Sequence, residues 1–384
     1  MTDSPTKTGP LGGIKVVELA GIGPGPYAGQ LLADMGADVV VIDRPGGGMP
    51  KAIDGRGKRS IVLDLKKPEA VEVLLKLAKT ADVLIEGLRP GVTERMGVGP
   101  EDCHAINPGL IYGRMTGWGQ SGPWSKMAGH DINYIGMTGV LNAIGKDGQP
   151  PVPPLNMVGD FGGGSLFLVT GILAALIERG RTGQGNIVDA AIVDGTHSLM
   201  SFVHGMAGLG QWRKEREGNL LDGAAPFYRC YMTADGKFMA VGCIETQFFT
   251  SMMERLPIDA EAYGGQHDRA AFAKQHEMLE DVFATKTRNE WEAIFAGTDA
   301  CVTPVLDYVE AAAHPANAER QAVVQDGRWL HPQVAPRLAT QPLATHFAIA
   351  TKGGDYAAIL AEAGLGDNEI SQLIAAGAVV ANKD

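Results

Sequence analysis

The stretch that decides the fold runs from Ile14 to Arg44 and reads Ile-Lys-Val-Val-Glu-Leu-Ala-Gly-Ile-Gly-Pro-Gly-Pro-Tyr-Ala-Gly-Gln-Leu-Leu-Ala-Asp-Met-Gly-Ala-Asp-Val-Val-Val-Ile-Asp-Arg. The apolar run Ile14–Leu19 predicts a buried strand. Residues Pro26–Met35 predict a helix that Gly36 ends, and Ala37–Ile42 predict the next strand. A strand, a helix and a second strand in this order form the unit from which parallel sheets are built.

The same alternation continues through the first half of the chain. Pro68 is suited to the first position of a helix that continues through Glu69–Lys79. A long helix is expected from about Gly163 to Arg179, where Gly180 would end it, and a further helix should extend to about Leu209. Strands are expected at Ser60–Leu65, Asp82–Ile85, Leu110–Arg114 and Asn186–Ala190. These elements predict an α/β fold with a parallel sheet and crossover helices.

The pattern changes after about residue 210. Residues 211–223 are charged and contain glycine, as is typical of a linker. Phe227–Met232 and Lys237–Val241 flank an Ala-Asp-Gly turn and predict a β-hairpin. Helical segments follow at Gln247–Leu256, Arg269–Ala284 and Asn289–Phe295. We therefore expect a large domain over 1–210, a linker over 211–223, a small α+β domain over 224–312 and a return segment to the large domain over 313–384.

Bulk properties restrict the classes of function. The 384 residues include 33 basic and 44 acidic side chains, for a net charge of −11. This balance argues against nucleic acid as a partner, although a local basic pocket can still hold one phosphorylated ligand. The four cysteines have no metal-ligand spacing, so no metal site is expected. The apolar stretch Leu166–Ile177 is short for a membrane span and contains Thr170 and Gly171. With no apolar signal segment at the N-terminus, a cytoplasmic protein without membrane contact is predicted.

The turn between the first strand and helix approaches a dinucleotide-binding fingerprint. Gly21 and Gly23 have the required spacing, but Pro26 stands where the third glycine should allow the helix to approach the strand. Nicotinamide binding is therefore not expected. Arg44 follows Asp43 where some dinucleotide sites hold an extra ribose phosphate, so it can meet the 3′-phosphate of a coenzyme A. A basic rim for this phosphate can include Arg44, Arg56, Lys58, Arg59, Lys66 and Arg89, of which we expect Arg44 and one or two others to bind and the rest to be surface charges.

Two short segments each place one candidate base at the expected beginning of an apolar helical run. Ala128–Tyr134 contains His130, and Val158–Gly164 contains Asp160. Two different bases that face one substrate from opposite sides can remove a proton from one face of a carbon and return one to the other. Taken singly, each residue is better explained as a helix cap, or for His130 as a surface residue. Together they indicate an isomerase that acts by proton transfer.

These segments belong to a longer set of motifs. The chain closely resembles the α-methylacyl-CoA racemases, members of the family III CoA-transferase fold, from about Leu11 to about Pro336. One departure is Cys243 with Thr246, where alanine and proline are more usual; both flank Glu245 without replacing it. The matching segments are Val16–Pro26, Ile42–Pro45, Leu63–Lys66, Gly129–Tyr134, Pro154–Asn156, Gly159–Phe161, Gly242–Phe248 and Thr298–Val305.

The resemblance implies a fold, an assembly and a set of site residues. The fold is a Rossmann-like large domain with a small domain, in two chains interlocked as a homodimer. Each active site then lies between the large domain of one subunit and the small domain of the other. His130 and Asp160 match the catalytic bases, and Glu245 matches the glutamate that supports the histidine. Coenzyme A would rest on Arg44, Leu63, Asp64, Leu65, Lys66, Arg89, Ala128, Gly129 and Asn133, and no cofactor is implied beyond the coenzyme A of the substrate.

The implied reaction interconverts (R)- and (S)-2-methylacyl-CoA thioesters by 1,1-proton transfer through an enolate. An imidazole titrates near neutrality, so His130 can act as acid or base. Asp160 needs a less solvated environment to return a proton readily, and its neighbours Phe161 and Met157 are compatible with this. The backbone N–H of Asp131 is the expected oxyanion donor, and Tyr134 is expected to hydrogen-bond one of the bases.

Two other functions remain open. Family III CoA transferases use an aspartate nucleophile to form an anhydride, and Asp131 could take that role. An inactive acyl-CoA-binding protein is the third reading. Methionines near the site, Met157 with Met232 and Met239 of the expected hairpin, could provide an adaptable apolar surface for the acyl chain. The sequence does not fix which acyl chain is bound.

Overall fold

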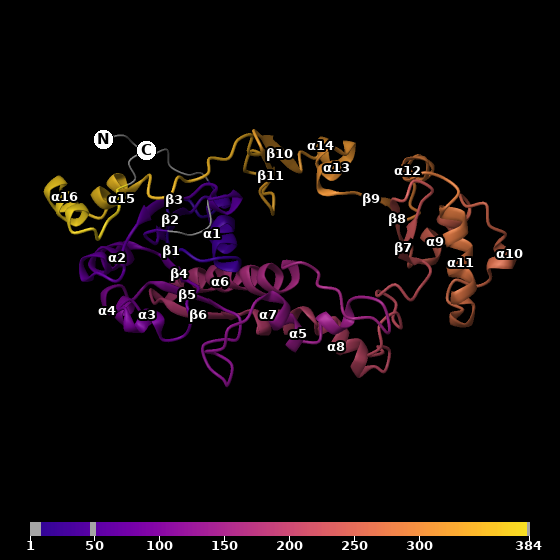
Figure 1. Ribbon diagram of the computed structural model, residues 1–384, viewed down its shortest axis with the longest axis horizontal. Helices are drawn as coiled ribbons and strands as arrows, with labels where there is room; N and C mark the ends of the chain where they lie inside the picture. Colours follow the sequence, from indigo (N-terminus) through magenta and orange to yellow (C-terminus); the bar gives the residue numbers. More distant parts are fainter. Residues whose placement is uncertain (1–8, 47–50, 382–384) are drawn as a thin grey trace. The chain divides into compact units, whose positions relative to one another are not determined.

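The computed structural model of the chain describes residues 9–46 and 51–381. They form two compact units (Figure 1). The first unit contains the chain up to Thr138, Leu155–Leu199 and the chain from Ala318 onward. The second unit contains Gly139–Pro154 and Met200–Asn317.

A six-stranded parallel sheet forms the centre of the first unit. Its strands are β1 (Lys15–Leu19), β2 (Asp38–Asp43), β3 (Arg59–Val62), β4 (Val83–Glu86), β5 (Ile111–Thr116) and β6 (Asn186–Ala191). They lie in the order β3-β2-β1-β4-β5-β6, and every neighbouring pair is parallel. The predicted α/β fold is confirmed. The strand order reverses between β1 and β4, and sheets of this kind bind ligands beyond the carboxyl ends of the strands at that point.

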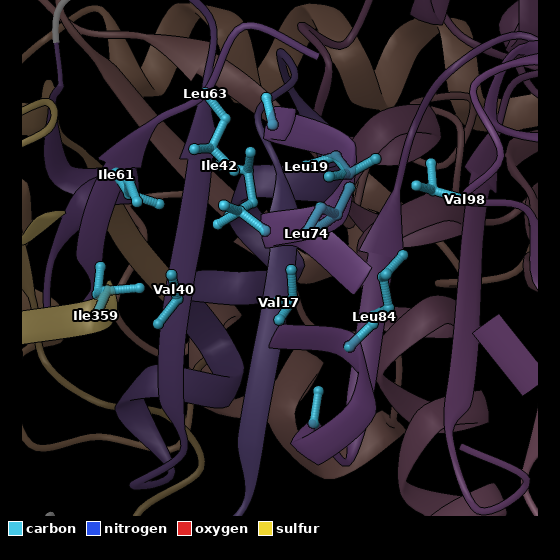
Figure 2. Close-up of a cluster of buried hydrophobic side chains, with 14 of the residues drawn as sticks. Val17, Leu19, Val40, Ile42, Ile61, Leu63, Leu74, Leu84, Val98 and Ile359 are labelled. Carbon is cyan, nitrogen blue, oxygen red and sulfur yellow. The ribbon is translucent and has the colours of Figure 1, made fainter. Parts of the chain in front are cut away.

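Both faces of the sheet are buried, as the continuous apolar strands require. Val17 and Leu84 point into one core, which Figure 2 shows together with Ile359 of the C-terminal segment. Val16, next to Val17, points into the core on the other face. The first core is covered by α2 (Pro68–Thr80), α15 (Tyr356–Glu362) and α16 (Asp367–Ala375), and the second by α1 (Pro24–Asp34) and α6 (Leu166–Thr182). The short helices α3 (Val92–Arg95) and α4 (Pro100–Ile106) connect β4 to β5.

The long apolar helix differs from its prediction at both ends. It begins as a π-helical segment, Met157–Ser165, and continues as α6 to Thr182. Gly180 lies inside α6; Gly183 ends it, because its φ of 70° places it in the left-handed region that glycine adopts most easily. The hydroxyl of Thr170 donates to the carbonyl of Leu166, so this residue does not interrupt the helix.

The continuous helix Met157–Thr182 spans 26 residues and is long and apolar enough to cross a membrane by length and composition alone. The expectation that this stretch is too short was therefore wrong. One such helix is weak evidence for a span, since core helices of soluble proteins pass the same test. Leu168 and Ile172 of α6 are fully buried in the first unit. A Cβ at Gly171 would lie 2.5 Å from Cγ1 of Val188, so glycine allows α6 to lie directly against β6.

The second unit is built on an antiparallel sheet of β7 (Tyr228–Met232), β8 (Phe238–Gly242) and β9 (Val302–Val305). The predicted hairpin is present, and β9 adds a strand that the sequence reading did not anticipate. Trp291, Phe283 and Tyr231 are fully buried in its core. The helices are α8 (Ser201–Gly208), α9 (Thr246–Met253), α10 (Ala260–Tyr263), α11 (Phe272–Phe283), α12 (Arg288–Phe295) and α13 (Tyr308–Ala313). In the chain that follows, α14 (Pro315–Glu319) precedes a hairpin of β10 (Val323–Asp326) and β11 (Trp329–Pro332).

The unit boundaries differ from the expected domain boundaries. Residues 139–154 and 200–210 were expected in the large domain but belong to the second unit, which also extends to Asn317. The physical reason is Arg216, whose guanidinium donates to the carbonyls of Asn142 and Gln149 and thereby holds the segment 139–154. The contact of 2.6 Å between Nε2 of His314 and Oε1 of Glu292 attaches the later residues in the same way.

Candidate active site

A cleft of about 480 Å³ opens where the carboxyl ends of β1, β2, β4 and β5 meet. The loops that follow these strands form its walls: Ala20–Pro24 after β1, Arg44 after β2, Gly87–Pro90 after β4 and Thr116–Trp118 after β5. This is the switch point of the sheet, where parallel topology gathers segments that are distant in sequence. The remaining lining residues are Met115, Ser125, Met127, Ala128, Gly129, His130, Tyr134, Asp160 and Ile192.

His130 lies at the N-terminal boundary of α5 (Asp131–Met137). Its backbone is extended, and its amide donates to Oδ1 of Asn133 at 3.1 Å. The side chain is exposed in this single chain and faces the cleft. The amide of Asp131 is the first of α5 and has no acceptor within the helix, as at every helix start. Its role as an oxyanion donor stays a prediction.

Asp160 lies in the first turn of the π-helical segment and is half-buried. A Cβ at Gly23 would lie 3.1 Å from its Oδ2, so the loop after β1 lies directly against the carboxylate, and the φ of 74° at Gly23 also favours glycine. The side-chain amide of Asn156 donates to Oδ2 at 3.3 Å. Burial is the main cause of a raised pKa of Asp160, and the charge of Asp131 raises this pKa further. The hydrogen bond from Asn156 and the nearby His130 act in the opposite direction. Asp160 therefore has the less solvated environment that the sequence reading required.

Asp131 is a structural link between the two helix starts. It is 7% exposed, and its Oδ1 accepts a hydrogen bond of 2.7 Å from the amide of Asp160. Its Oδ2 is buried and has no partner among the residues that the structure describes. Burial raises the pKa of Asp131, and the hydrogen bonds from the amides of Asp160 and Gly159 oppose the shift. A buried, amide-bound carboxylate is poorly placed for nucleophilic attack, so the geometry favours Asp160 over Asp131 as the carboxylate that meets a ligand.

Tyr134 contacts backbone rather than a base. Its hydroxyl donates to the carbonyl of Gly129, and its single proton is thereby used. Its ring fits a slot between Gly117 and Gly129, where any Cβ would overlap the ring, and it meets Trp118 edge-on with a centroid distance of 4.8 Å. The expected hydrogen bond to a catalytic base is therefore replaced by a role in fixing the segment before His130.

A buried polar frame holds the loop after β1. Nζ of Lys58 donates to Oε2 of Glu18 at 2.7 Å and to the carbonyl of Pro26 at 2.8 Å. Both charged side chains are almost fully buried, at 1% and 2% exposed. Oγ of the buried Ser165 lies 2.8 Å from the carbonyl of Pro24 and 3.1 Å from that of Asp160, and joins the loop to the π-helical segment. The sequence analysis did not identify the frame residues Glu18 and Ser165. The one signal for Glu18 was a charged residue inside an apolar strand.

A second cavity, of about 1090 Å³, lies beside the cleft and shares Ala20, Arg44 and Leu88 with it. The predicted coenzyme A residues Asp64, Leu65 and Lys66 line this cavity together with Arg44. The other predicted residues, Arg89, Ala128 and Gly129, line the first cleft, whereas Asn133 lines neither space. Leu63 borders the cavity, but its side chain is 0% exposed and belongs to the core, so it can offer a ligand little beyond its backbone.

The proposed basic rim is smaller than the sequence suggested. Arg56 pairs with Asp34, Lys58 with Glu18, and Arg59 with Asp38 and Glu362. These cations are committed to carboxylates, and Arg56 and Lys58 are buried rather than surface charges. Arg44, Lys66 and Arg89 are exposed and make no ion pair within the described part of the chain. Arg95, which the sequence reading did not include, also lines the second cavity.

The remaining predicted residues lie in the second unit. Glu245 precedes α9 and is exposed. Its pairing with His130 stays a prediction. Met232 is 58% exposed, but Met239 is fully buried in the core of the second unit and provides no surface for an acyl chain. All four cysteines are free of disulfides.

Comparison with known proteins identifies the family. Residues 11–351 match the family described as CoA-transferase family III. The alpha-methylacyl-CoA racemase of Mus musculus is 46% identical over 365 residues, which cover 94% of this chain and 96% of that protein. The alpha-methylacyl-CoA racemase of Homo sapiens is 45% identical over 375 residues, covering 97% and 98%. The crystal structure of a CAIB/BAIF family protein from Brucella suis superposes with a TM-score of 0.80 at 28% identity, and covers 92% of this chain and 99% of that chain. The chain therefore belongs to CoA-transferase family III.

Proposed function

We propose that this chain is an α-methylacyl-CoA racemase, an isomerase that interconverts the (R) and (S) forms of 2-methylacyl-CoA thioesters. The two racemases that it resembles match it over nearly its full length at 45–46% identity. The observation that carries the assignment of the bases is that His130 and Asp160 line one cleft from the starts of two different helical segments. No cofactor enters the proposed reaction.

The proton transfers balance between these two side chains. One base takes the α-proton from one face of the substrate, and the electron pair of the broken C–H bond moves into the thioester enolate. The conjugate acid of the other base then gives a proton to the opposite face. For one enantiomer neutral His130 is the base and protonated Asp160 is the acid; for the other, the roles reverse. The raised pKa of Asp160, caused first by its burial, favours this exchange because it brings a carboxyl group closer to the pH at which imidazole titrates.

The enolate needs stabilisation as it forms, because the α-proton of a thioester is very weakly acidic. The free amides at the start of α5 lie next to His130 and are the proposed oxyanion donors. Asp131 aligns this helix start with the π-helical segment through its hydrogen bond to the amide of Asp160. A carboxylate so committed supports the geometry rather than the covalent chemistry of a CoA transferase.

The proposed binding mode places the coenzyme A in the larger cavity and the acyl group in the cleft. Arg44 lies at the boundary of both spaces and is exposed, which suits the 3′-phosphate of coenzyme A. The cleft itself presents Ile22, Met127 and Trp118 to the acyl chain. Of these, Ile22 is 75% exposed, and this is a large apolar side chain to leave against water without a ligand.

We also propose a homodimer in which a second copy supplies Glu245 to His130. Several large apolar side chains of the first unit are exposed in the single chain, among them Leu155, Met157 and Ile177 at 61–69%. In the second unit Phe202 and Leu209 are 57% and 72% exposed. Surfaces of this kind mark interaction sites. A cytoplasmic location stays a prediction that cell fractionation would test.

The reaction is tested by one incubation in deuterium oxide. A chirally pure 2-methylacyl-CoA, with no acceptor acid, is followed for α-deuterium and for configuration. Deuterium uptake together with loss of chiral purity is the expected result. An intact thioester without exchange, over several acyl chain lengths, would contradict the racemase; transfer of coenzyme A to an added carboxylic acid would then favour a transferase.

The dimer is tested by pairing two inactive variants. His130→Ala and Glu245→Gln chains are co-expressed with different tags, and the mixed dimer is purified. If a second copy supplies Glu245, one site carries both changes and the other carries neither, so about half of the wild-type activity per dimer returns. The mixed dimer should stay inactive if each chain uses its own Glu245. Light scattering of the wild type provides the independent measurement of the oligomeric state.

A further inference from the structure

The second unit contains a cavity of about 530 Å³ that the proposed reaction does not use. One wall is the segment 213–229 that precedes and enters β7. The other is formed by His267, Arg269 and the beginning of α11. Its volume is within the range of small-molecule sites, which is roughly 300–1,000 Å³. Every lining residue belongs to the second unit.

The loop that forms one wall of this cavity is held in place by side-chain hydrogen bonds. Asn219 is 4% exposed, and its Oδ1 accepts from the amide of Arg213 at 2.7 Å. Its side-chain amide donates to the carbonyl of Arg213 at 3.0 Å and to Oδ2 of Asp222 at 2.9 Å. Asp222 in turn accepts from the amide of Gly218. These bonds fix the backbone from which the arginine side chain projects.

The cavity carries an excess of positive charge. Three arginines line it against one carboxylate, that of Glu217. Arg229 is committed, because it pairs with Glu217 at 3.4 Å and donates to the carbonyl of Gly223. Within the described part of the chain, Arg213 and Arg269 have no carboxylate at ion-pair distance. Both arginines lie next to Gly218. Nη1 of Arg269 lies 3.5 Å from the carbonyl oxygen of Gly218. Cδ of Arg213 would lie 3.5 Å from a Cβ placed on Gly218.

Several other arginines of the chain are committed to carboxylates. Arg59, Arg114 and Arg288 all meet carboxylates at 2.5–2.9 Å. The chain has 11 more acidic than basic residues. Arg213 and Arg269 nevertheless meet no carboxylate at ion-pair distance within the described residues, as is also true of Arg44 and Arg89 beside the proposed substrate spaces. The charge does not come from His276, whose pKa is lowered by burial and whose Nε2 lies 2.9 Å from the carbonyl of Ala224.

An apolar surface lies beside the two arginines. Leu220 is 39% exposed and lines the cavity. The ring of Phe272 does the same, and it packs at 85° on the buried ring of Phe227 with a centroid distance of 6.1 Å. A ligand with both a charged and an apolar part would therefore meet a matching surface for each.

We propose that this cavity binds a small organic oxyanion. Its phosphate or carboxylate is held by the guanidinium groups of Arg213 and Arg269, which suit the planar fork geometry of such oxygens. Its apolar body lies on Leu220 and Phe272. No residue lines both this cavity and the proposed coenzyme A cavity.

Calorimetric titration of the full-length protein tests the site with three probes: phenyl phosphate, benzoate and inorganic phosphate. Phenyl phosphate should bind several-fold more tightly than inorganic phosphate, and the ratio of phenyl phosphate to benzoate distinguishes phosphate from carboxylate as the preferred group. The Arg213→Gln/Arg269→Gln variant should lose at least about tenfold in affinity, because each removes charge-assisted hydrogen bonds. Arg255→Gln, in the same unit, is the matched control and should bind as the wild type does.

Two further variants test whether binding depends on the guanidinium geometry and whether it occurs at this cavity. Arg213→Lys/Arg269→Lys retains the charge and should bind more weakly than the wild type but more tightly than the glutamine variant. Arg44→Gln removes an arginine from the proposed coenzyme A site and should leave probe binding intact. Binding that disappears in Arg44→Gln and persists in Arg213→Gln/Arg269→Gln would overturn the proposal and leave the proposed racemase activity unaffected. Absence of saturable binding for all three probes would overturn it as well.

Discussion

The two units make their cavities in different ways. In the first unit, the cleft lies at the carboxyl ends of parallel strands, so the backbone itself brings together the loops after β1, β2, β4 and β5. A buried ion pair and closely packed glycines then hold these loops. In the second unit, strands run antiparallel, and the cavity lies between one loop and the beginning of α11, with Arg213 and Arg269 exposed. The parallel topology therefore positions the groups of the first site, whereas side chains determine the shape and charge of the second.

The largest expected effect on activity comes from changing either of the two proposed catalytic bases of the first unit, His130 and Asp160. His130→Ala and Asp160→Asn should each reduce racemisation by about 10²–10⁴-fold, which is what a positioned acid or base contributes to the rate. Each variant should still exchange the α-proton of the enantiomer served by its remaining base. The measurement is deuterium uptake from each pure enantiomer, with calorimetric binding of coenzyme A as the control. Unchanged racemisation in either variant would remove that residue from the mechanism.

The next effect compares the ion pairs of the two units. Lys58→Met leaves Glu18 buried without its cation and should lower the free energy of unfolding by about 3–5 kcal/mol. Arg229→Met breaks the half-exposed pair with Glu217 and should cost less than about 1 kcal/mol. Urea unfolding followed by fluorescence and circular dichroism measures both. Equal losses would contradict the view that the ion pair beside the first cavity is buried and the one beside the second is not.

A smaller effect tests Asp131 as a link. Asp131→Ala leaves the amide of Asp160 without its acceptor and should cost about 1–3 kcal/mol of stability. Asp131→Asn keeps an oxygen for that amide and should retain most activity. If Asp131 were the nucleophile of a CoA transferase, the wild type would transfer coenzyme A to an added carboxylic acid and the asparagine variant would lose this transfer. Thermal unfolding, the deuterium assay and this transfer assay decide between these outcomes.

Arg44→Ala should weaken binding of acyl-CoA by about tenfold through loss of charge-assisted hydrogen bonds to phosphate. Binding of 3′-dephospho-CoA esters should change much less, because they lack the group that Arg44 is expected to meet. Arg181→Ala, an exposed arginine at the end of α6, is the matched control. An equal loss for both esters would remove the assignment to the 3′-phosphate.

The smallest effect is a shift in pH dependence. The charge of Asp131 contributes to the raised pKa of Asp160, after the larger effect of burial. For the enantiomer that Asp160 deprotonates, activity is lost as the pH falls through this pKa. Asp131→Asn removes the charge and should move the acid limb of kcat/KM to lower pH, while the limb of an Asp222→Asn variant in the second unit stays in place. A shift to higher pH would contradict the electrostatic coupling.

Residue patterns alone determined much of the framework. The apolar runs around Val16, Val40 and Leu84 predicted buried strands because a strand covered on both faces has no polar side. His130 and Asp160 were found because each stands where an apolar helical run begins, a signal that is local in sequence. The extended motif resemblance supplied the family, which the comparisons confirmed.

Only the tertiary structure decided which charges are available to a ligand. Arg56, Lys58 and Arg59 look like Arg44 in the sequence, yet their carboxylate partners lie 21–303 positions away, and no local pattern reports such pairings. The same holds for Asp131 and Asp160: burial and one long-range hydrogen bond distinguish Asp131, the proposed link, from Asp160, the proposed base. The sequence by itself determined the elements and the types of chemical groups. Burial and pairing between distant segments, which arise only when the chain packs, decided the role of each group.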